Sequence, residues 1–425
     1  MAVALAGLNP VRHVLANGVR LIAKAARVTP AVTIHVAVHA GTAADPPSLP
    51  GLAYFLSRMI DRGTATMTAD DIAEALEGRG VSLATSVTRH ALSLVSTCLI
   101  EDFPAVLRIM ADCVRTPSFS EQEIGTRRGE MITFIRQDAD NPAAVAMNGL
   151  MEALYGAGHP YGRRPRGTVE GAERIDRDAL VDFHARLVVP RSVVVTVVGD
   201  VEPGAAAAAC EEAFDGWQGS PPADHQPEEP PPASGRRCRV IPMMNKSQTD
   251  IAYGFTSIRR SDPDYYACWL MNNVLGEYSL GGRLGDTIRE RQGMAYYVVS
   301  SLDANVIPGP LAIRAGVAAA NVERAIAAID HEVEMLAKEG PTGTELLESR
   351  QYLIGSLPRT LETNASIAGF LQGVEFFGLG LDYDVRLPEL LQSVSHEDVH
   401  AAARRLLDPA RAAVVVAGPY DGTLA

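Results

Sequence analysis

Apolar and polar residues alternate along two similar segments of this chain, and each segment leads into a stretch with helical spacing. Ala31 to Gly41 (AVTIHVAVHAG) and Thr249 to Ile258 (TDIAYGFTSI) both alternate as half-buried strands do. Each then passes through a polar loop that contains proline and enters an apolar helical stretch, Leu52 to Ile60 in the first case and Tyr265 to Leu275 in the second. Two further helices are predicted at Asp102 to Arg115 and Val322 to Lys338. Strands and helices in this arrangement predict an α+β fold with helices on one face of each sheet.

The chain opens on two short apolar segments that flank Asn17-Gly18, in the sequence VRHVLANGVRLIA. Asn-Gly is the dipeptide that a two-residue type I′ turn favours, because both central residues of that turn need a positive φ. We therefore expect a β-hairpin at this end of the chain.

Two segments far apart in the sequence share one pattern of cap, helix, proline and strand. Ile175 to Asp200 (IDRDALVDFHARLVVPRSVVVTVVGD) and Val394 to Pro419 (VSHEDVHAAARRLLDPARAAVVVAGP) align at one constant offset without a gap. The matched positions are Asp176 and Ser395 as helix N-caps, Pro190 and Pro409, and Gly199 and Gly418. Agreement of three independent signals at one offset indicates an internal duplication.

Between the two copies lies a segment that cannot form a core. Gln218 to Arg236 (QGSPPADHQPEEPPPASGR) is rich in proline and glutamate and has almost no apolar side chains, as extended linkers do. The sequence thus predicts two homologous α/β-sandwich halves with mostly antiparallel sheets, at 1–217 and 237–425, joined by a Pro-rich linker at 218–236.

Composition narrows the range of partners. Hydrophobic residues make up 47% of the 425 residues, and the formal net charge is −13. Binding to nucleic acid depends on clustered Lys and Arg, and no long run of either occurs, so a nucleic-acid partner is not expected. An acidic chain suits a basic peptide ligand, although net charge speaks first to solubility.

Cysteine usage and the N-terminus bear on the compartment. The five cysteines are scattered and form no CxxC pair, so we expect neither a disulfide framework nor a cysteine zinc site. No uncharged apolar run approaches the roughly 18 residues of a membrane span. MAVALAGLNPVRH is a poor secretory signal, so a cytoplasmic location is the expectation, or a periplasmic or other exported one if a signal has been removed.

One segment resembles the active-site helix of a known family. Gly51 to Thr64 (GLAYFLSRMIDRGT) is similar to G-L-A-H-F-L-E-H-M-x-F-x-G-T of the pitrilysin, insulinase and mitochondrial-processing-peptidase family, the inverzincin metallopeptidases with an H-x-x-E-H motif. The resemblance extends over nearly the whole chain. It implies two homologous α+β halves joined by a linker, as the duplication suggests independently.

The residues that carry the family's chemistry are replaced in this chain. The two His positions are Tyr54 and Arg58, the general-base Glu position is Ser57, and the distal Glu position aligns with Phe134, within a register uncertain by one to four residues. Arginine has no lone pair to offer a metal, and phenylalanine has no ligand atom at all. We expect no metal in this chain, and we expect Glu130, one helical turn before Phe134, to be an ordinary surface residue.

A second segment resembles a family element that lies opposite the zinc. Gly281 to Ser301 (GGRLGDTIRERQGMAYYVVSS) is similar to R-E-x-x-G-L-A-Y, and its matching residues are Arg289 and Tyr296. The pattern places Arg289 in a last helical turn, Gly293 at the C′ position and Tyr296 at the start of a strand. An Arg and a phenol together can hold a peptide carbonyl and stabilise its oxyanion. The alternative is that Arg289 pairs with Glu290 and Tyr296 packs in the sheet.

His396 to His400 spells H-E-x-x-H, the signature of a different class of zinc peptidase. Ser395 and Asp398 form a capping pattern there, and no third ligand follows in AAARRLLDP, so a surface helix is the preferred interpretation. His35 and His39, on a predicted strand, are expected to be satisfied structural residues.

Three functions are compatible with these patterns. The first is a non-catalytic subunit of a heterodimeric zinc metallopeptidase, which completes the peptide chamber and supplies Arg289 and Tyr296 to a zinc-bearing homologous partner. The second is a peptidase-inactive scaffold or peptide-binding protein of the same fold, with a homodimer as one arrangement. The third is an independent zinc peptidase that uses His396 and His400.

Overall fold

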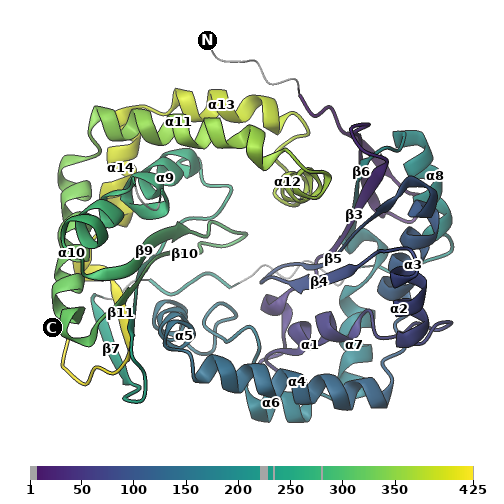
Figure 1. The fold of residues 1–425 in the computed structure, drawn as a ribbon, viewed down its shortest axis with the longest axis horizontal. Coiled ribbons are helices and arrows are strands. Elements are labelled where there is room, and N and C mark those ends of the chain that lie inside the picture. The colour runs from purple at the N-terminus through teal and green to yellow at the C-terminus, as the bar shows by residue number, and fades with distance from the viewer. Residues whose placement is uncertain (1–6, 221–227, 233–234, 279–280, 425) are drawn as a thin grey trace. The chain divides into compact units, whose positions relative to one another are not determined.

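The computed structural model describes residues 7–220, 228–232, 235–278 and 281–424 (Figure 1). The predicted linker, 218–236, lies partly outside these described residues. The chain forms two compact units. The first comprises Met1–Ile135, Arg164–Gln226 and Leu357–Val385, and the second comprises Arg136–Arg163, Pro227–Ser356 and Arg386–Ala425.

The strands, in chain order, are β1 (Val11–Val14), β2 (Arg20–Ala25), β3 (Ala31–Val38), β4 (Leu83–Val87), β5 (Leu92–Leu99), β6 (Val193–Gly199), β7 (Arg237–Pro242), β8 (Thr249–Thr256), β9 (Ala295–Leu302), β10 (Pro310–Val317) and β11 (Ala413–Gly418). The α-helices are α1 (Leu52–Met59), α2 (Ala69–Glu77), α3 (Phe103–Arg115), α4 (Glu121–Ala139), α5 (Pro142–Tyr155), α6 (Val169–Arg174), α7 (Arg177–Leu187), α8 (Pro203–Ala213), α9 (Tyr265–Asn272), α10 (Val322–Glu339), α11 (Gly343–Thr360), α12 (Asn364–Phe376), α13 (Tyr383–Ser393) and α14 (His396–Leu406). Two π-helical segments are η4 (Asn273–Glu277) and η5 (Gly285–Arg291), and 3₁₀ turns occur at η1 (Thr42–Ala44), η2 (Ile100–Asp102), η3 (Pro190–Ser192), η6 (Ala319–Asn321) and η7 (Pro409–Arg411).

The two sheets repeat one topology. The first has the order β1-β2-β6-β3-β5-β4, and the second has the order β7-β11-β8-β10-β9. In each, one pair runs parallel, β2 with β6 and β7 with β11, and the other neighbouring pairs run antiparallel. If β1 is set aside, the strands match one to one in order and direction. The predicted α+β fold with two homologous halves and mostly antiparallel sheets is confirmed.

Helices cover both faces of the first sheet. Val193, Val195 and Val197 of β6 face the main core, which includes residues of α1, α3, α7 and α8. The alternate residues Val194 and Val198 point the other way and pack against Ile367, Ala368 and Leu371 of α12. The expectation that helices lie on one face of each sheet is therefore wrong, because α12 covers part of the second face (Figure 1).

The second sheet has the same arrangement. Tyr253 of β8 donates a hydrogen bond to Asp330 of α10, at 2.9 Å, on one face. Its neighbour Gly254 faces α5, where a Cβ atom would lie 3.1 Å from Leu150. Since α5 precedes the linker and α12 follows it, each compact unit contains a helix from the other sequence half. The boundaries of the two homologous halves, 1–217 and 237–425, remain a prediction from the sequence.

Several local expectations can be compared with the backbone. Asp176 and Ser395 are the N-caps of α7 and α14, as predicted. β1 and β2 form the expected hairpin, in which Val14 pairs with Arg20. The turn is longer than the predicted two-residue type. The amide of Leu15 donates to Val19 O, so three residues form the loop, and the last of them, Gly18, has φ +96°.

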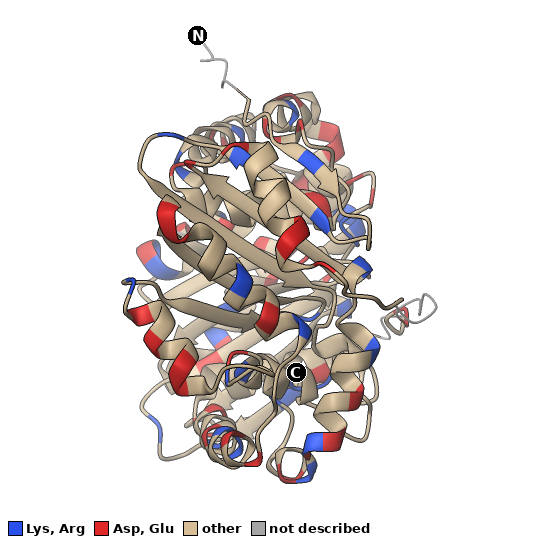
Figure 2. Ribbon diagram, turned by 90° about the vertical axis from the view of Figure 1, so that its right-hand side faces the viewer, with Lys and Arg blue, Asp and Glu red and all other residues tan. Residues whose placement is uncertain are grey.

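Charged residues of both signs are interspersed along the strands and helices that Figure 2 turns toward the viewer. Across the described parts of the chain, no helix combines the length and the hydropathy needed to cross a membrane.

Candidate functional site

The start of α1 is held by a buried carboxylate and by two close backbone approaches. Asp45 accepts hydrogen bonds from the amides of Gly51 and Ala53, both at 2.7 Å, and so satisfies the free donors of the first helical turn. Gly51 has φ +94°, and a Cβ there would lie 2.7 Å from Arg166 O. At Gly167 a Cβ would lie 2.0 Å from Pro50 O. These contacts place Arg166 beside α1.

α1 buries one side and presents the other. Leu52, Phe55, Leu56 and Met59 are buried at helical spacing. Tyr54 and Arg58, one turn apart, are both partly accessible. Ser57 is buried and donates a hydrogen bond from Oγ to Tyr54 O at 2.7 Å, so its hydroxyl is used within the helix.

α4 brings two residues to the accessible side of α1. Nη2 of Arg58 lies 3.9 Å from Oε2 of Glu130, and Nη1 of Arg127 lies 2.5 Å from Oε1 of the same carboxylate. Arg127 also contacts Glu123 at 3.3 Å. Glu130 thus lies between two guanidinium groups, a more specific environment than the ordinary surface position expected for it.

Arg166 lies against the two aromatic residues among the predicted motif positions. Its guanidinium carbon lies 5.4 Å from the ring centroid of Tyr54 and 5.6 Å from that of Phe134. A cation over two ring faces is attracted to their negative quadrupole. The four predicted motif positions, Tyr54, Ser57, Arg58 and Phe134, lie on two neighbouring helices, α1 and α4, and two of them, Tyr54 and Phe134, contact Arg166.

This donor set does not fit a zinc ion. Zinc sites use three or four Cys, His or carboxylate ligands, whereas Glu130 is the carboxylate here and already binds Arg127. Arg58, Arg127 and Arg166 would each repel a dication. Among the residues that the structure describes, no group of three or more His, Cys, Asp or Glu side chains is placed to hold a metal.

The predicted Arg–Tyr pair flanks the end of a π-helix in the second unit. Gly293 has φ +61°, and its amide donates to Arg289 O at 3.1 Å, which confirms it as the residue that ends this helical segment. Tyr296 lies near the start of β9, the edge strand, and is 83% exposed. It is therefore not packed in the sheet, as one alternative held. Arg289 is 43% exposed and lies 3.4 Å from Glu290, as that alternative expected.

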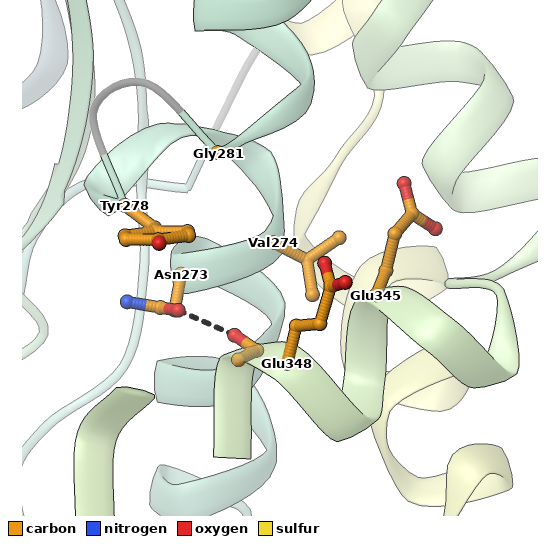
Figure 3. Close-up of a pocket in the computed structure, with 7 residues that line it drawn as sticks. Asn273, Val274, Tyr278, Gly281, Glu345 and Glu348 are labelled. Carbon is orange, nitrogen blue, oxygen red and sulfur yellow. Dashed lines mark hydrogen bonds between the residues drawn. The ribbon is translucent and has the colours of Figure 1, made fainter. Parts of the chain in front are cut away.

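A small pocket adjoins the other π-helix, η4. It is lined by Asn273, Val274, Tyr278, Gly281, Glu345, Glu348 and Ser349, and it offers about the space of one water molecule (Figure 3). Ser349 donates a hydrogen bond to Oδ1 of Asn273 at 2.5 Å, and Nδ2 of Asn273 has no partner within the described chain. Glu345, in the first turn of α11, forms part of the pocket wall, and its carboxylate is held by a 2.7 Å hydrogen bond from Arg283. No pattern in the sequence predicts this pocket.

The H-E-x-x-H residues of α14 bind backbone carbonyls. Nε2 of His396 contacts Pro341 O, and Nε2 of His400 contacts Ala337 O at 3.1 Å, near the C-terminal end of α10. Nδ1 of His400 faces Nη1 of Arg404 at 3.1 Å, so both ring nitrogens of His400 have partners. Ser395 and Asp398 form the expected capping box. These contacts favour a structural role for both histidines.

The histidines on and after β3 have unlike surroundings. His39 packs edge-on against Phe376, with ring centroids 5.0 Å apart. Nε2 of His35 is buried and has no hydrogen-bond partner among the described residues, so the expectation of a satisfied side chain is wrong for this atom. The strand face that carries His35 is the one that α12 partly covers.

Asp45 and Arg166 carry no sequence signal that marks them as parts of the site. Asp45 precedes Pro46-Pro47 in a loop, and its distance from α1 in the sequence hides its role as a cap. Arg166 lies in the basic run RRPR, which predicts exposure and gives no sign of the two rings beneath it.

Comparisons with known proteins agree with the two halves. A family profile described as Insulinase (Peptidase family M16) matches residues 20–164, and one described as Peptidase M16 inactive domain matches residues 174–353. A Mycobacterium leprae relative named an uncharacterized zinc protease is 27% identical over 417 residues, which cover 96% of this chain and 92% of the relative. A Helicobacter pylori relative named non-peptidase homolog YmxG is 22% identical over 373 residues, which cover 86% and 84%.

A solved structure is similar over the full length. The crystal structure of a peptidase M16 inactive domain from Pseudomonas fluorescens superimposes with a TM-score of 0.90 and 28% identity, and the match covers 98% of this chain and 99% of that one. The profiles, the relatives and this structure confirm the family that the residue patterns indicated. The chain belongs to peptidase family M16, and residues 174–353 match the inactive domain type of that family.

Proposed function

We propose that this chain is the non-catalytic subunit of a heterodimeric zinc metallopeptidase. It completes the peptide chamber of a zinc-bearing homologous subunit and supplies Arg289 and Tyr296 to that subunit's metal site. It binds no zinc of its own, because guanidinium groups and aromatic rings stand where the ligands would be.

The observation that carries the proposal is the state of the Arg–Tyr pair. Tyr296 is 83% exposed on an edge strand, and its hydroxyl makes no hydrogen bond with any described residue. Exposing a tyrosine to this extent forgoes the stability that its burial would add, by about 1.5–3 kcal/mol for a large side chain. An exposed phenol and an exposed guanidinium in one helix-to-strand segment are suited to a ligand that arrives from outside the chain.

One of the named relatives favours a second candidate. A relative called a non-peptidase homolog covers most of this chain, which supports a peptide-binding or scaffold protein without peptidase activity in any complex. The two candidates differ in whether Arg289 and Tyr296 act on a partner's reaction.

The test is to mix the purified chain with a relative that has an intact H-x-x-E-H motif and to measure hydrolysis of a quenched fluorescent peptide. We expect activity to rise on mixing. Arg289→Ala or Tyr296→Phe should lower kcat by about 100-fold, the scale of losing one donor to a developing oxyanion. The controls are Arg291→Ala, at an exposed Arg, and Tyr420→Phe, at a half-buried Tyr whose hydroxyl donates to Glu323; both should leave kcat unchanged.

Other results would contradict the proposal. No activation with any intact relative would favour the scaffold candidate. One zinc per isolated chain, with hydrolysis abolished by His396→Ala, would favour an independent peptidase instead.

A further inference from the structure

Arg58 is a half-buried guanidinium whose hydrogen-bonding capacity is largely unused. Its side chain is 35% exposed, and the 3.9 Å to Glu130 is too long for a hydrogen bond. No other ion pair or hydrogen bond of Arg58 occurs within the described residues. A guanidinium group is a planar fork of five N–H donors, and when these donors are unbonded it is suited to bind a planar acceptor such as a carboxylate.

The charges around Arg58 favour an anion. Glu130 is the nearest carboxylate, but Arg127 binds it at 2.5 Å and Arg127 also contacts Glu123. Asp61, on which Arg58 also acts, is buried and paired with Arg62 at 2.9 Å. Arg166 adds a third guanidinium beside Tyr54 and Phe134. Arg58 therefore has no carboxylate within hydrogen-bond distance among the described residues, and its charge is only partly offset.

The accessible side of α1 also faces aromatic rings. Phe134 is partly exposed, and the rings of Phe134 and Tyr54 flank Arg166. Tyr54 precedes Arg58 by one helical turn, so the two side chains share the accessible side of α1. The same positive charge that opposes a metal ion therefore attracts a carboxylate.

We infer that Arg58, on the face formed by Tyr54, Phe134 and Arg166, binds a carboxylate group of a peptide at the position where active relatives hold zinc. The carboxylate is either the peptide's C-terminus or an Asp or Glu side chain. This rests on the proposed function in one respect, that the chain binds peptides. Arg58 then replaces the metal's positive charge and anchors the peptide without cleaving it.

The test uses the full chain alone and four fluorescein-labelled ten-residue peptides of one sequence. They combine an internal Glu or Gln with a C-terminal carboxylate or amide, and binding is measured by fluorescence anisotropy. We expect removal of the recognised carboxylate to weaken binding about tenfold or more, the effect of one charge-assisted pair. If replacing the internal Glu by Gln weakens binding, the recognised carboxylate is the side chain. If replacing the C-terminal carboxylate by an amide weakens binding, it is the C-terminus.

Variants of the chain test the residue itself. Arg58→Met should abolish the preference for the carboxylate, and Arg58→Lys should retain part of it because a point charge remains without the fork. Glu130→Gln should strengthen binding, because it removes a competing acid. Arg108→Met, at an exposed Arg on α3 paired with Glu212, is the matched control and should change nothing. Thermal unfolding confirms that each variant is folded.

Equal binding of all four peptides, or a preference that survives Arg58→Met, would overturn the inference, and so would the absence of any binding. These outcomes are separable from failure of the subunit proposal. Activation of a zinc-bearing relative without any carboxylate preference would refute only the role of Arg58. A carboxylate preference in a chain that activates no relative would refute only the subunit role.

Discussion

Three histidines of the first unit lie in surroundings that oppose their protonation. His39 and His90 pack against Phe376 of α12, and His35 lies on β3 opposite Thr196. Burial lowers the pKa of His35 and of His90 to about 4, and it also lowers the pKa of His39. The charges that act on them are mixed: Arg20 and Arg89 add to the lowering at His39 and His90 respectively, whereas Glu375 opposes it at His39.

These pKa values predict acid sensitivity. Because the folded-state pKa of each His lies below its ordinary value of 6.5, the unfolded chain binds protons first, and stability falls as the pH drops from about 6.5 toward 4. For His35 alone the loss amounts to about 3 kcal/mol. We expect Tm to fall over this range, and His35→Gln to reduce the dependence. His13→Gln, at an exposed position, is the control, and an unchanged slope in His35→Gln would contradict the prediction.

At the scale of elements, α12 is attached to the first sheet by polar contacts at each end. Glu375, whose side chain is 5% exposed, accepts hydrogen bonds from Nε of Arg12 at 3.0 Å and from Nη1 of Arg20 at 3.1 Å. Thr196 donates to Gln372 at 2.8 Å, and Asn364 donates to Ala31 O at 3.1 Å. The apolar contacts to Val194 and Val198 lie between these ends and hold the helix across β6 and β3.

Neutralising Glu375 should loosen this attachment. Glu375→Gln leaves Arg12 and Arg20 without a buried counter-charge, and because both guanidiniums reach solvent the cost should be about 2 kcal/mol rather than the larger value of a fully buried pair. Urea unfolding measures the change. Glu202→Gln breaks an exposed pair with Arg27 and should change the free energy of unfolding by less than about 0.5 kcal/mol. Similar losses in both variants would show that Glu375 has no special role.

At the scale of the molecule, each compact unit depends on a helix from the other half of the sequence. A fragment of residues 1–217 lacks α12, so Ile22, Val194 and Val198 lose the side chains that cover them. A fragment of residues 237–425 lacks α5, which covers the second sheet at Gly254 and Val415. The first sheet therefore requires α12 and the second requires α5, whether or not the linker is intact.

Splitting the chain in the linker tests this dependence. We expect each fragment, expressed alone, to lack a cooperative thermal transition because a large apolar area is uncovered. Co-expressed fragments should purify together and recover the transition. Circular dichroism and co-purification measure both effects, and a fragment that unfolds cooperatively on its own would contradict the prediction.

Much of the architecture could be predicted from local pattern. The strands that begin at Ala31 and Thr249, the caps at Asp176 and Ser395, and the duplicated ends follow from local signals, and the structure bears them out. The expected half-buried character of the two strands is wrong, because helices cover both faces of each sheet and nearly all residues of these strands are buried. The two-residue turn that Asn17-Gly18 predicts is too short. The register of β1 and β2, rather than the dipeptide, decides the length of the loop. α12 on a second sheet face could not be predicted, since nothing local says which sheet a helix joins.

The sequence by itself determined the family, the repeated halves and the identity of the side chains at the predicted motif positions, because these depend on residue type and spacing along the chain. Only the tertiary structure decided what those side chains contact. It placed Arg166 over Tyr54 and Phe134, left Arg58 without a hydrogen bond among the described residues, and exposed Tyr296 on an edge strand. Contacts of this kind join residues far apart in the sequence, and packing rather than local preference selects them.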